Sequence, residues 1–318
     1  AWLGLELNTM SILPIMMKQH HPRTSEATTK YFLIQATAAA TLLFASTINA
    51  WQTGQWSLTH TNSPMTTTIA TIAIMVKLGL APTHSWYPEV LQGTTLHTAM
   101  IISTWQKVAP LTMLYLIHSN TTPMILMACG LVSVIIGGIT GLNQTQARKI
   151  MAFSSIAHMG WFMTAMTINQ SLTTLTILLY LITTTATFIA LTNTSTKTIN
   201  DLNTTWTMSP TLLTTTMITL LSLAGLPPLT GFMPKWLIIY ELSTINMLPI
   251  GMALLFATLP SLFFYTRMAY MTTLTNPPTT TTTKLSWRFT NTSQPTTMTM
   301  ITLAWLLIPM TSMLHNTT

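Results

Sequence analysis

Charged side chains are missing from long stretches of this chain. Residues 31–59, 119–147 and 150–196 contain no Asp, Glu, Lys or Arg. Charged residues make up 5% of the whole sequence, against about 25% in an ordinary soluble domain. A soluble protein needs a polar surface, whereas a helix that crosses a bilayer presents apolar side chains and satisfies its backbone internally. The chain is therefore predicted to be an all-α polytopic membrane protein with a single membrane domain over residues 1–318.

The formal net charge of +7 does not indicate binding to nucleic acid. Lys and Arg are scattered or lie in short connections, and they form no basic face with stacking aromatic residues. Anionic phospholipid is the expected partner of these cations. Cys129 is the single cysteine, which excludes a disulfide framework or a cysteine-ligated iron–sulfur cluster within this chain.

Hydropathy and the positions of Gly and Pro predict where the chain crosses the bilayer. Segment 210–242 contains internal Gly and Pro, and it can be one broken span or two separate elements. Counted as one, it brings the number of visible transmembrane helices to ten. A Thr- and Pro-rich polar loop is expected at 271–296, followed by a C-terminal helix within 297–318. The predicted spans are 1–17, 27–50, 66–90, 94–118, 122–142, 148–168, 171–193, 210–242, 245–270 and 297–315.

The positive charges of the connections support the count of one span for 210–242. With that count, the Lys and Arg residues of the connections fall in odd-numbered connections, as expected when short positive loops stay on one side of the membrane. Two spans at 210–242 would move the last charged loop to the opposite side. These residues are Lys18, Arg23, Lys30, Arg148, Lys149, Lys197, Lys284 and Arg288.

Two apolar spans are interrupted by the same combination of Gly, Pro and a neighbouring Lys. The first reads KLGLAPTHSWYPEV at 77–90, and the second reads LAGLPPLTGFMPKW at 223–236. Gly frees the backbone and Pro removes a hydrogen-bond donor, so both helices are expected to break. The two breaks lie five spans apart, and an odd offset inverts the topology. Inverted five-helix repeats are therefore predicted over 1–118 and 122–270. The residues of the breaks are Gly79, Pro82, Gly225, Pro227 and Pro228.

Four ionisable residues remain within the predicted spans: Glu6, Lys77, Lys107 and Lys235. Each costs about 2.5–3.5 kcal/mol if it faces lipid, so all four are expected to face protein or water. Glu6 and Lys77 lie at matching depth, which predicts an ion pair or a water-bridged pair. A buried pair that only fixes helix register is the alternative. Acids and bases near the midplane are typical of a proton relay, with Lys107 as its switch.

Three further residues could extend this relay. His84 follows Lys77 by seven residues and would share its face if the segment were helical. His158 lies five spans after Glu6, and neutral His can pass protons through its two nitrogens. Packing histidines are the alternative for both. Glu241 lies six residues after Lys235 and is either an outlet for its proton or a plain interfacial charge.

Several sequence motifs together resemble a known family. The chain is similar, over nearly its whole length, to the antiporter-like proton-pumping subunits of mitochondrial NADH–ubiquinone oxidoreductase, respiratory complex I, subunit 2 among them. The family's membrane carboxylate matches Glu6, and its membrane lysines match Lys77, Lys107 and Lys235. The motifs are WLGLELN (2–8), HPRTSEATTKYFL (21–33), KLGLAPTHSWYPEVLQG (77–93), TWQKVAP (104–110), GLNQTQARKIMAFSSIAHMGW (141–161) and LSLAGLPPLTGFMPKW (221–236).

The resemblance implies a place in the mitochondrial inner membrane, with the odd-numbered positive loops on the matrix side. It implies redox-driven proton translocation by a translocase, beside other complex I membrane subunits and neighbouring antiporter-like subunits. NADH, FMN, iron–sulfur clusters and ubiquinone are expected in partner subunits, and no cofactor in this chain. Bound phospholipid such as cardiolipin is expected. The family has eleven helices in animals, so one more is expected before Ala1.

Two other functions are compatible with the same residues. A standalone cation/proton antiporter would also need ionisable groups at the midplane, and it would show exchange activity as an isolated chain. A structural membrane subunit that only holds neighbours and lipid would keep turnover when its lysines are neutralised.

Overall fold

The computed structural model describes residues 2–18, 20–57, 63–207, 210–274 and 295–307. Its elements are helices, joined in one place by an isolated antiparallel bridge between Gln146 and Thr198. The prediction of an all-α chain is confirmed. The chain divides into two compact units, one of residues 1–136 and 155–170 and the other of residues 137–154 and 171–318.

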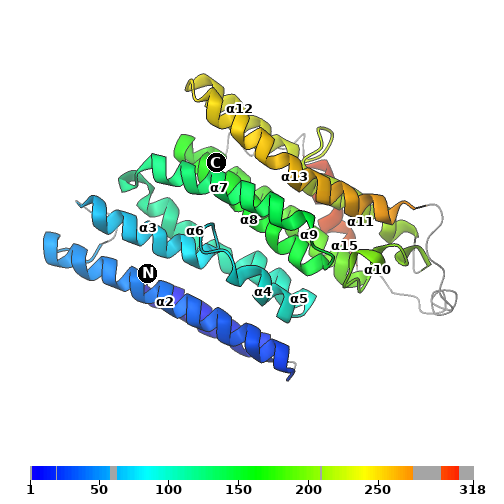
Figure 1. The fold of residues 1–318 in the computed structure, drawn as a ribbon, viewed down its shortest axis with the longest axis horizontal. Coiled ribbons are helices and arrows are strands. Elements are labelled where there is room, and N and C mark those ends of the chain that lie inside the picture. Colours follow the sequence, from blue (N-terminus) through cyan, green and yellow to red (C-terminus); the bar gives the residue numbers. More distant parts are fainter. Residues whose placement is uncertain (1, 19, 58–62, 208–209, 275–294, 308–318) are drawn as a thin grey trace. The chain divides into compact units, whose positions relative to one another are not determined.

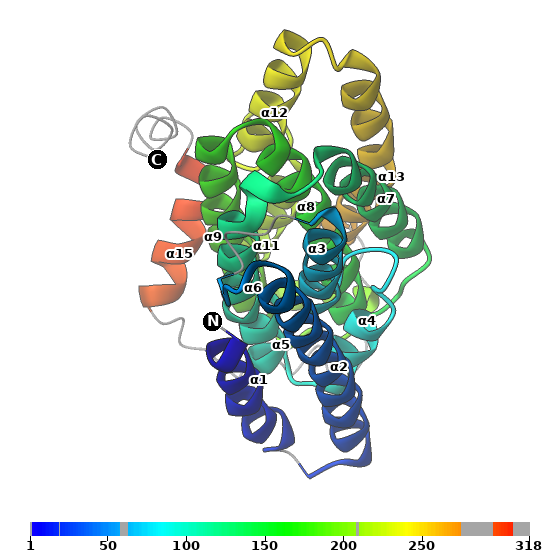
Figure 2. The same ribbon diagram turned by 90° about the vertical axis from the view of Figure 1, so that its left-hand side faces the viewer.

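The first unit begins with an antiparallel pair of helices, against which some of the following helices pack (Figures 1 and 2). The pair is α1 (Trp2–Met17) and α2 (Pro22–Thr53), and α2 packs against both α3 and α4. The other elements are α3 (Pro64–Leu78), α4 (Trp86–Gly93), α5 (Leu96–Ser103), α6 (Trp105–Ile117), η1 (His118–Asn120) and the larger parts of α7 (Pro123–Leu142) and α8 (Ala147–Ile168).

Helix α2 begins earlier than its hydropathy predicted. His21 accepts a hydrogen bond from the Arg23 backbone N–H at 3.1 Å, and Pro22 occupies the first helical position. Both features favour a helix start. Lys30, expected in a connection, consequently lies inside α2, where it pairs with Glu26 at 2.6 Å and with Glu89 of α4 at 2.7 Å.

The second unit contains the later helices of the chain. They are α9 (Gln170–Asn193), α10 (Ile199–Leu202), η2 (Thr205–Thr207), α11 (Pro210–Ala224), α12 (Phe232–Thr244), α13 (Leu248–Thr272) and α15 (Pro295–Leu306). Helix α15 lies beside α9 (Figure 2), where Ile301 and Ala304 pack against Ala186 in a small apolar core. Helix α7 approaches α13 closely, since a Cβ added at Gly141 would lie 2.9 Å from the Phe264 ring.

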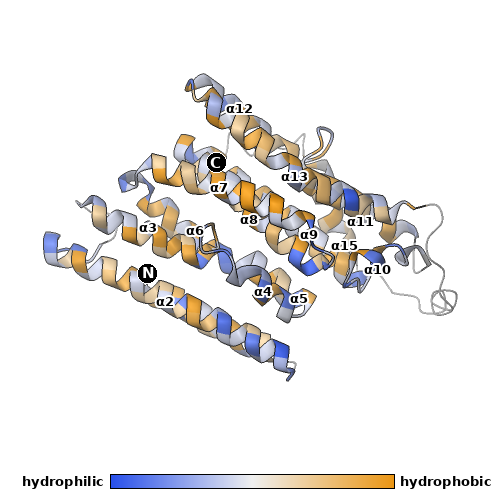
Figure 3. Cartoon of the chain, in the orientation of Figure 1, coloured by the Kyte–Doolittle hydropathy of each residue, from blue (hydrophilic) through white to orange (hydrophobic). Residues whose placement is uncertain are grey.

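Apolar residues run along the helices, and hydrophilic residues gather near helix ends such as the first turns of α2 (Figure 3). Among the described residues, four helices have the length and apolar composition to cross a membrane: α2, α7, α9 and α13. The count of ten spans and the inverted repeats stay predictions. Most of the predicted loop 271–296, with Lys284 and Arg288, lies outside the described residues, as does the end of the predicted C-terminal helix.

Candidate functional site

The first interrupted span separates α3 from α4. Helix α3 ends at Leu78, and Gly79 adopts a left-handed conformation with φ 72°. The Ala81–Pro82 peptide bond is cis, and helix resumes at Trp86. The break frees the backbone carbonyl of Lys77, which accepts a hydrogen bond from the Gln35 side chain of α2 at 3.2 Å. A neutral amide thus supplies the donor that lipid cannot supply.

The second interrupted span separates α11 from α12. Helix α11 ends at Ala224, Gly225 has φ 82°, and α12 begins only at Phe232, after Pro227 and Pro228. The freed carbonyl of Ala224 accepts a hydrogen bond from the Lys235 ammonium at 2.9 Å. Within the same break, the Thr230 hydroxyl donates to the Ala304 carbonyl of α15.

A third interruption, which the sequence analysis did not predict, divides the span 94–118 at Thr104. This residue separates α5 from α6 and has φ −112° and ψ −72°. Its hydroxyl donates to the Met100 carbonyl at 2.7 Å, a local bond that competes with regular helix and bends it. Pro110 inside α6 removes one further helical donor. Lys107 therefore sits in a distorted stretch of helix between Thr104 and Pro110.

Glu6 and Lys77 do not form a direct ion pair. Lys77 is 6% exposed and Glu6 is half-buried. Neither the Lys77 ammonium nor the buried Glu6 carboxylate oxygen Oε2 makes a hydrogen bond to a described residue. The ion-pair alternative is therefore wrong for the described structure, and the water-bridged alternative stays a prediction.

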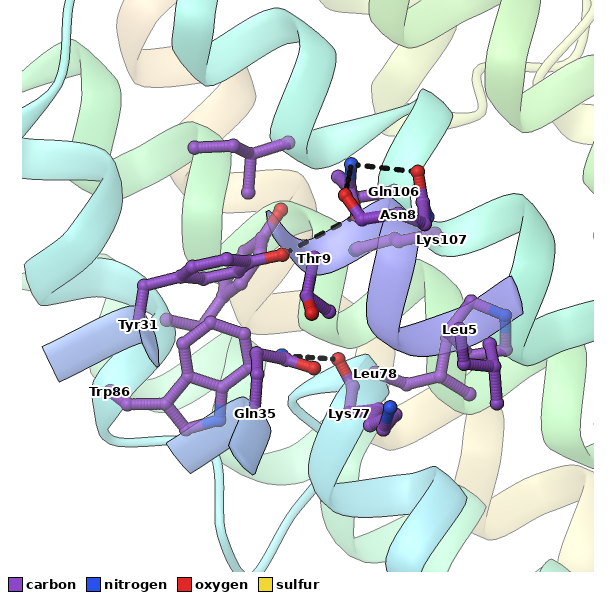
Figure 4. A pocket seen from close by; sticks show the side chains of 13 residues that line it. Leu5, Asn8, Thr9, Tyr31, Gln35, Lys77, Leu78, Trp86, Gln106 and Lys107 are labelled. Carbon is purple, nitrogen blue, oxygen red and sulfur yellow. Dashed lines mark hydrogen bonds between the residues drawn. The ribbon is translucent and has the colours of Figure 1, made fainter. Parts of the chain in front are cut away.

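Lys77 and Lys107 line the same small cavity of the first unit (Figure 4). Measured as the space open to the centre of a water molecule, its volume is about 20 Å³, and about 10–15 Å³ is enough for one water. Polar side chains of α1, α2 and α6 share the wall with the two lysines. The lining residues are Leu5, Asn8, Thr9, Tyr31, Gln35, Lys77, Leu78, Trp86, Tyr87, Ile102, Gln106, Lys107 and Pro110.

A hydrogen-bonded network, also missed by the sequence analysis, holds α1, α2 and α6 together beside Lys107 (Figure 4). The side chains of Asn8 and Gln106 exchange hydrogen bonds, at 3.0 Å from Asn8 and 3.1 Å from Gln106. The Tyr31 hydroxyl donates to the same Gln106 oxygen at 3.3 Å. Asn8 and Gln106 are 98 positions apart, so no local pattern could have paired them.

Comparison with known proteins identifies the family of this chain. Residues 1–261 match the model of the family described as NADH:quinone oxidoreductase/Mrp antiporter, TM, and residues 262–315 match NADH dehydrogenase subunit 2 C-terminus. The NADH-ubiquinone oxidoreductase chain 2 of Tetraodon nigroviridis is 51% identical over 98% of this chain and 89% of that protein. The chain of that name from Carassius auratus is 49% identical over 98% of this chain and 90% of its own length.

The chain belongs to the NADH-ubiquinone oxidoreductase chain 2 family. Its fold also matches a chain of respiratory complex I from Thermus thermophilus, with a TM-score of 0.87, 23% identity, and coverage of 99% of this chain and 74% of that chain. This match shows the fold alone. The resemblance drawn from the sequence motifs is confirmed.

His84, His158 and Glu241, the further residues expected in the relay, are not among the residues that line the cavity. His84 lies in the break, with its Nδ1 3.3 Å from the Pro82 carbonyl. His84 would share a face with Lys77 only if the segment between them were helical, and it is not, because α3 ends at Leu78. His158 is half-buried on α8 and Glu241 is half-buried on α12. In the described part of the chain, no three His, Cys, Asp or Glu residues gather as a metal site.

Proposed function

We propose that this chain translocates protons across the mitochondrial inner membrane as a membrane-arm subunit of NADH:ubiquinone oxidoreductase. The relay comprises Glu6, Lys77 and Lys107 in the first unit and Lys235 in the second. One observation carries the proposal: two buried lysines from different helices, Lys77 and Lys107, line one cavity with room for water.

Burial of these lysines argues against a purely structural role. A cation at membrane depth costs about 2.5–3.5 kcal/mol on insertion scales, and ion pairing does not offset that cost for the Lys77 ammonium. Each lysine also lies beside a helix interruption, where regular helical hydrogen bonding ends. An amine that gains and loses a proton, next to a segment that can move, is what alternating access to two sides of a membrane requires.

Within this relay, Glu6 biases the charge on Lys77, and Lys107 receives the proton through water in the shared cavity. Lys235 is the next acceptor, with Glu241 as its outlet. His84 and His158 are proton carriers of secondary importance, since neither lines the cavity that joins the two lysines.

The proposal extends to the surroundings of the chain. NADH, FMN, iron–sulfur clusters and ubiquinone are bound by partner subunits, and their redox chemistry drives the charge changes in this chain. Other complex I membrane subunits, neighbouring antiporter-like subunits among them, cover its apolar flanks. Phospholipids such as cardiolipin bind its cationic loops, which lie on the matrix side.

Substitution of Lys107 tests the proposed function. Lys107→Met removes the charge while keeping much of the volume, and Lys107→Arg keeps a charge that cannot be given up. Both variants should assemble and lose proton pumping coupled to NADH oxidation, measured in membrane vesicles with a pH-sensitive dye. NADH oxidation by an artificial acceptor, which bypasses the membrane arm, should be unchanged.

Lys197→Met is the matched control, because Lys197 is exposed between α9 and α10. Its pumping should equal that of the parent complex. Normal pumping by an assembled Lys107→Met complex would rule out the relay and favour a structural subunit. Exchange activity of the isolated chain would favour the standalone antiporter.

A further inference from the structure

The ring of Tyr87 faces the ammonium of Lys107. The Nζ atom of Lys107 lies over the ring, 4.7 Å from its centroid. Both residues are buried, Tyr87 at 1% and Lys107 at 3% exposure. The negative face of an aromatic ring attracts an ammonium group and has no comparable attraction for a neutral amine, and this preference is strongest where water is excluded.

We propose that Tyr87 is a positioning residue of the proton relay, whose ring holds Lys107 in its protonated form. This inference rests on the proposed function and adds a residue to it. Tyr87 belongs to α4, the helix that resumes after the first break, whereas Lys107 belongs to α6. The contact therefore joins the broken span that carries Lys77 to the helix that carries Lys107.

The position of the Tyr87 ring depends on the conformation of the break. A Cβ added at Gly79 would lie 3.3 Å from the Tyr87 Cβ and 3.4 Å from the Trp86 ring, so the left-handed turn at Gly79 packs directly against the base of this side chain. Lys77 lies two residues earlier in the chain. A rearrangement of the break that follows a change of charge on Lys77 would move the ring and weaken its hold on the Lys107 proton.

An aromatic series fixes the ring from the other side. The Tyr87 and Trp86 rings meet edge to face at 5.5 Å, and Trp86 meets the Tyr31 ring of α2 at 6.0 Å. Tyr31 in turn donates to Gln106, the residue before Lys107. The series thus starts at Lys107 and ends at Gln106, both on α6, and it fixes the Tyr87 ring relative to the Lys107 ammonium.

Other ionisable groups also bear on Lys107. The elements that contact α6 carry Glu6 on α1, Tyr31 on α2, Lys77 on α3, Glu89 on α4, His97 on α5 and His118 on η1. Of these, Lys77 and Tyr31 line the cavity with Lys107. A test of Tyr87 must therefore leave these groups in place and compare variants at position 87 alone.

The test is the pH profile of NADH-driven proton pumping by complexes that carry Tyr87→Leu or Tyr87→Phe. Leu removes the ring and keeps an apolar side chain, whereas Phe keeps the ring and removes the hydroxyl. Without the ring, Lys107 loses its proton at lower pH. The alkaline limb of the Leu profile should therefore move to lower pH by about one unit, while the Phe profile stays within about 0.3 units of the parent. Tyr87→Met is the second ring-free variant if Leu lowers assembly.

The two proposals can fail separately. Unchanged profiles for the ring-free variants, in complexes whose pumping Lys107→Met abolishes, would overturn the role of Tyr87 and leave the relay standing. An equal shift for Phe and Leu would assign the effect to the hydroxyl and also overturn it. Normal pumping by Lys107→Met would overturn the relay itself.

Discussion

The two interrupted spans meet the same backbone problem in different ways. At the first break the freed carbonyl of Lys77 accepts a hydrogen bond from Gln35, a neutral side chain of another helix. At the second, the freed carbonyl of Ala224 accepts one from Lys235, the ionisable residue itself. The Lys77 ammonium therefore makes no hydrogen bond to described residues, and Lys77 lines a cavity, whereas the Lys235 ammonium is held by the end of its own broken span.

The shared Gly, Pro and Lys pattern suggested that the two breaks have the same role. The difference in their hydrogen bonds indicates two different roles. Lys77 can change its charge without removing a donor from the backbone at its break. Loss of the Lys235 proton leaves a neutral amine, whose hydrogen bond to the Ala224 carbonyl is weaker than that of the ammonium, so the charge on Lys235 is coupled to the ending of α11. We infer that charge is coupled directly to a backbone hydrogen bond at the second break, whereas at the first break Lys77 acts on the backbone only through packing.

Neutralising each lysine should show the largest effect and separate the two breaks. Lys77→Met and Lys235→Met should both lower coupled proton pumping by about 100-fold, the usual contribution of a positioned proton-transfer group. Only Lys235→Met should also lower the thermal midpoint of the assembled complex, because the Ala224 carbonyl then loses its donor at a cost of about 1–3 kcal/mol.

Pumping is measured in vesicles, and the thermal midpoint from loss of the intact complex on heating. Lys197→Met should change neither quantity, since it makes the same substitution at an exposed position. Equal thermal midpoints for Lys77→Met and Lys235→Met would contradict the comparison.

Removing the neutral donor at the first break should have a smaller effect. Gln35→Leu leaves the Lys77 carbonyl unsatisfied and should destabilise the complex by about 1–3 kcal/mol, with pumping reduced less than by Lys77→Met. Gln52→Leu on the same helix is the matched control, because Gln52 is exposed. Should both variants show the parent thermal midpoint, Gln35 would not be the donor on which the first break depends.

The C-terminal helix should make the smallest contribution. Thr230→Val removes the hydroxyl that donates to the Ala304 carbonyl and fills the same space, so a loss of about 0.5–1.5 kcal/mol is expected. Thr302→Val makes the same change at an exposed position of α15. A lower thermal midpoint for Thr230→Val alone would show that α15 steadies the second break, and equal midpoints for the two variants would contradict that role.

Hydropathy and the positions of Gly and Pro were enough to predict the helical class and both Gly/Pro breaks. The ends of α7 and α13 lie within a few residues of their predicted positions, because local sequence determines where these helices begin and end. The interruption at Thr104 could not be predicted, since one Thr among many gives no distinct signal. The start of α2 at Pro22 depended on a His cap, which lies outside the usual capping residues.

The cavity was beyond prediction for a different reason. Depth along separate helices placed Glu6, Lys77 and Lys107 near the midplane, but depth says nothing about which faces meet. Tyr87 and Gln106 belong to the sequence motifs at 77–93 and 104–110. The residues that they contact lie on other helices, so these contacts depend on packing in three dimensions. The same limit explains why an ion pair or a water-bridged pair of Glu6 and Lys77 was expected, whereas the described structure holds no direct pair.

In the proposed relay, Lys77 and Lys107 exchange a proton through water in their shared cavity. High-resolution density of the assembled, membrane-extracted complex tests this most directly, because the cavity lined by Lys77 and Lys107 has room for an ordered water. We predict density for at least one water that contacts the Lys77 Nζ atom and continues toward Lys107. A well-resolved site without water, with the two ammonium groups separated by packed apolar side chains, would contradict the account.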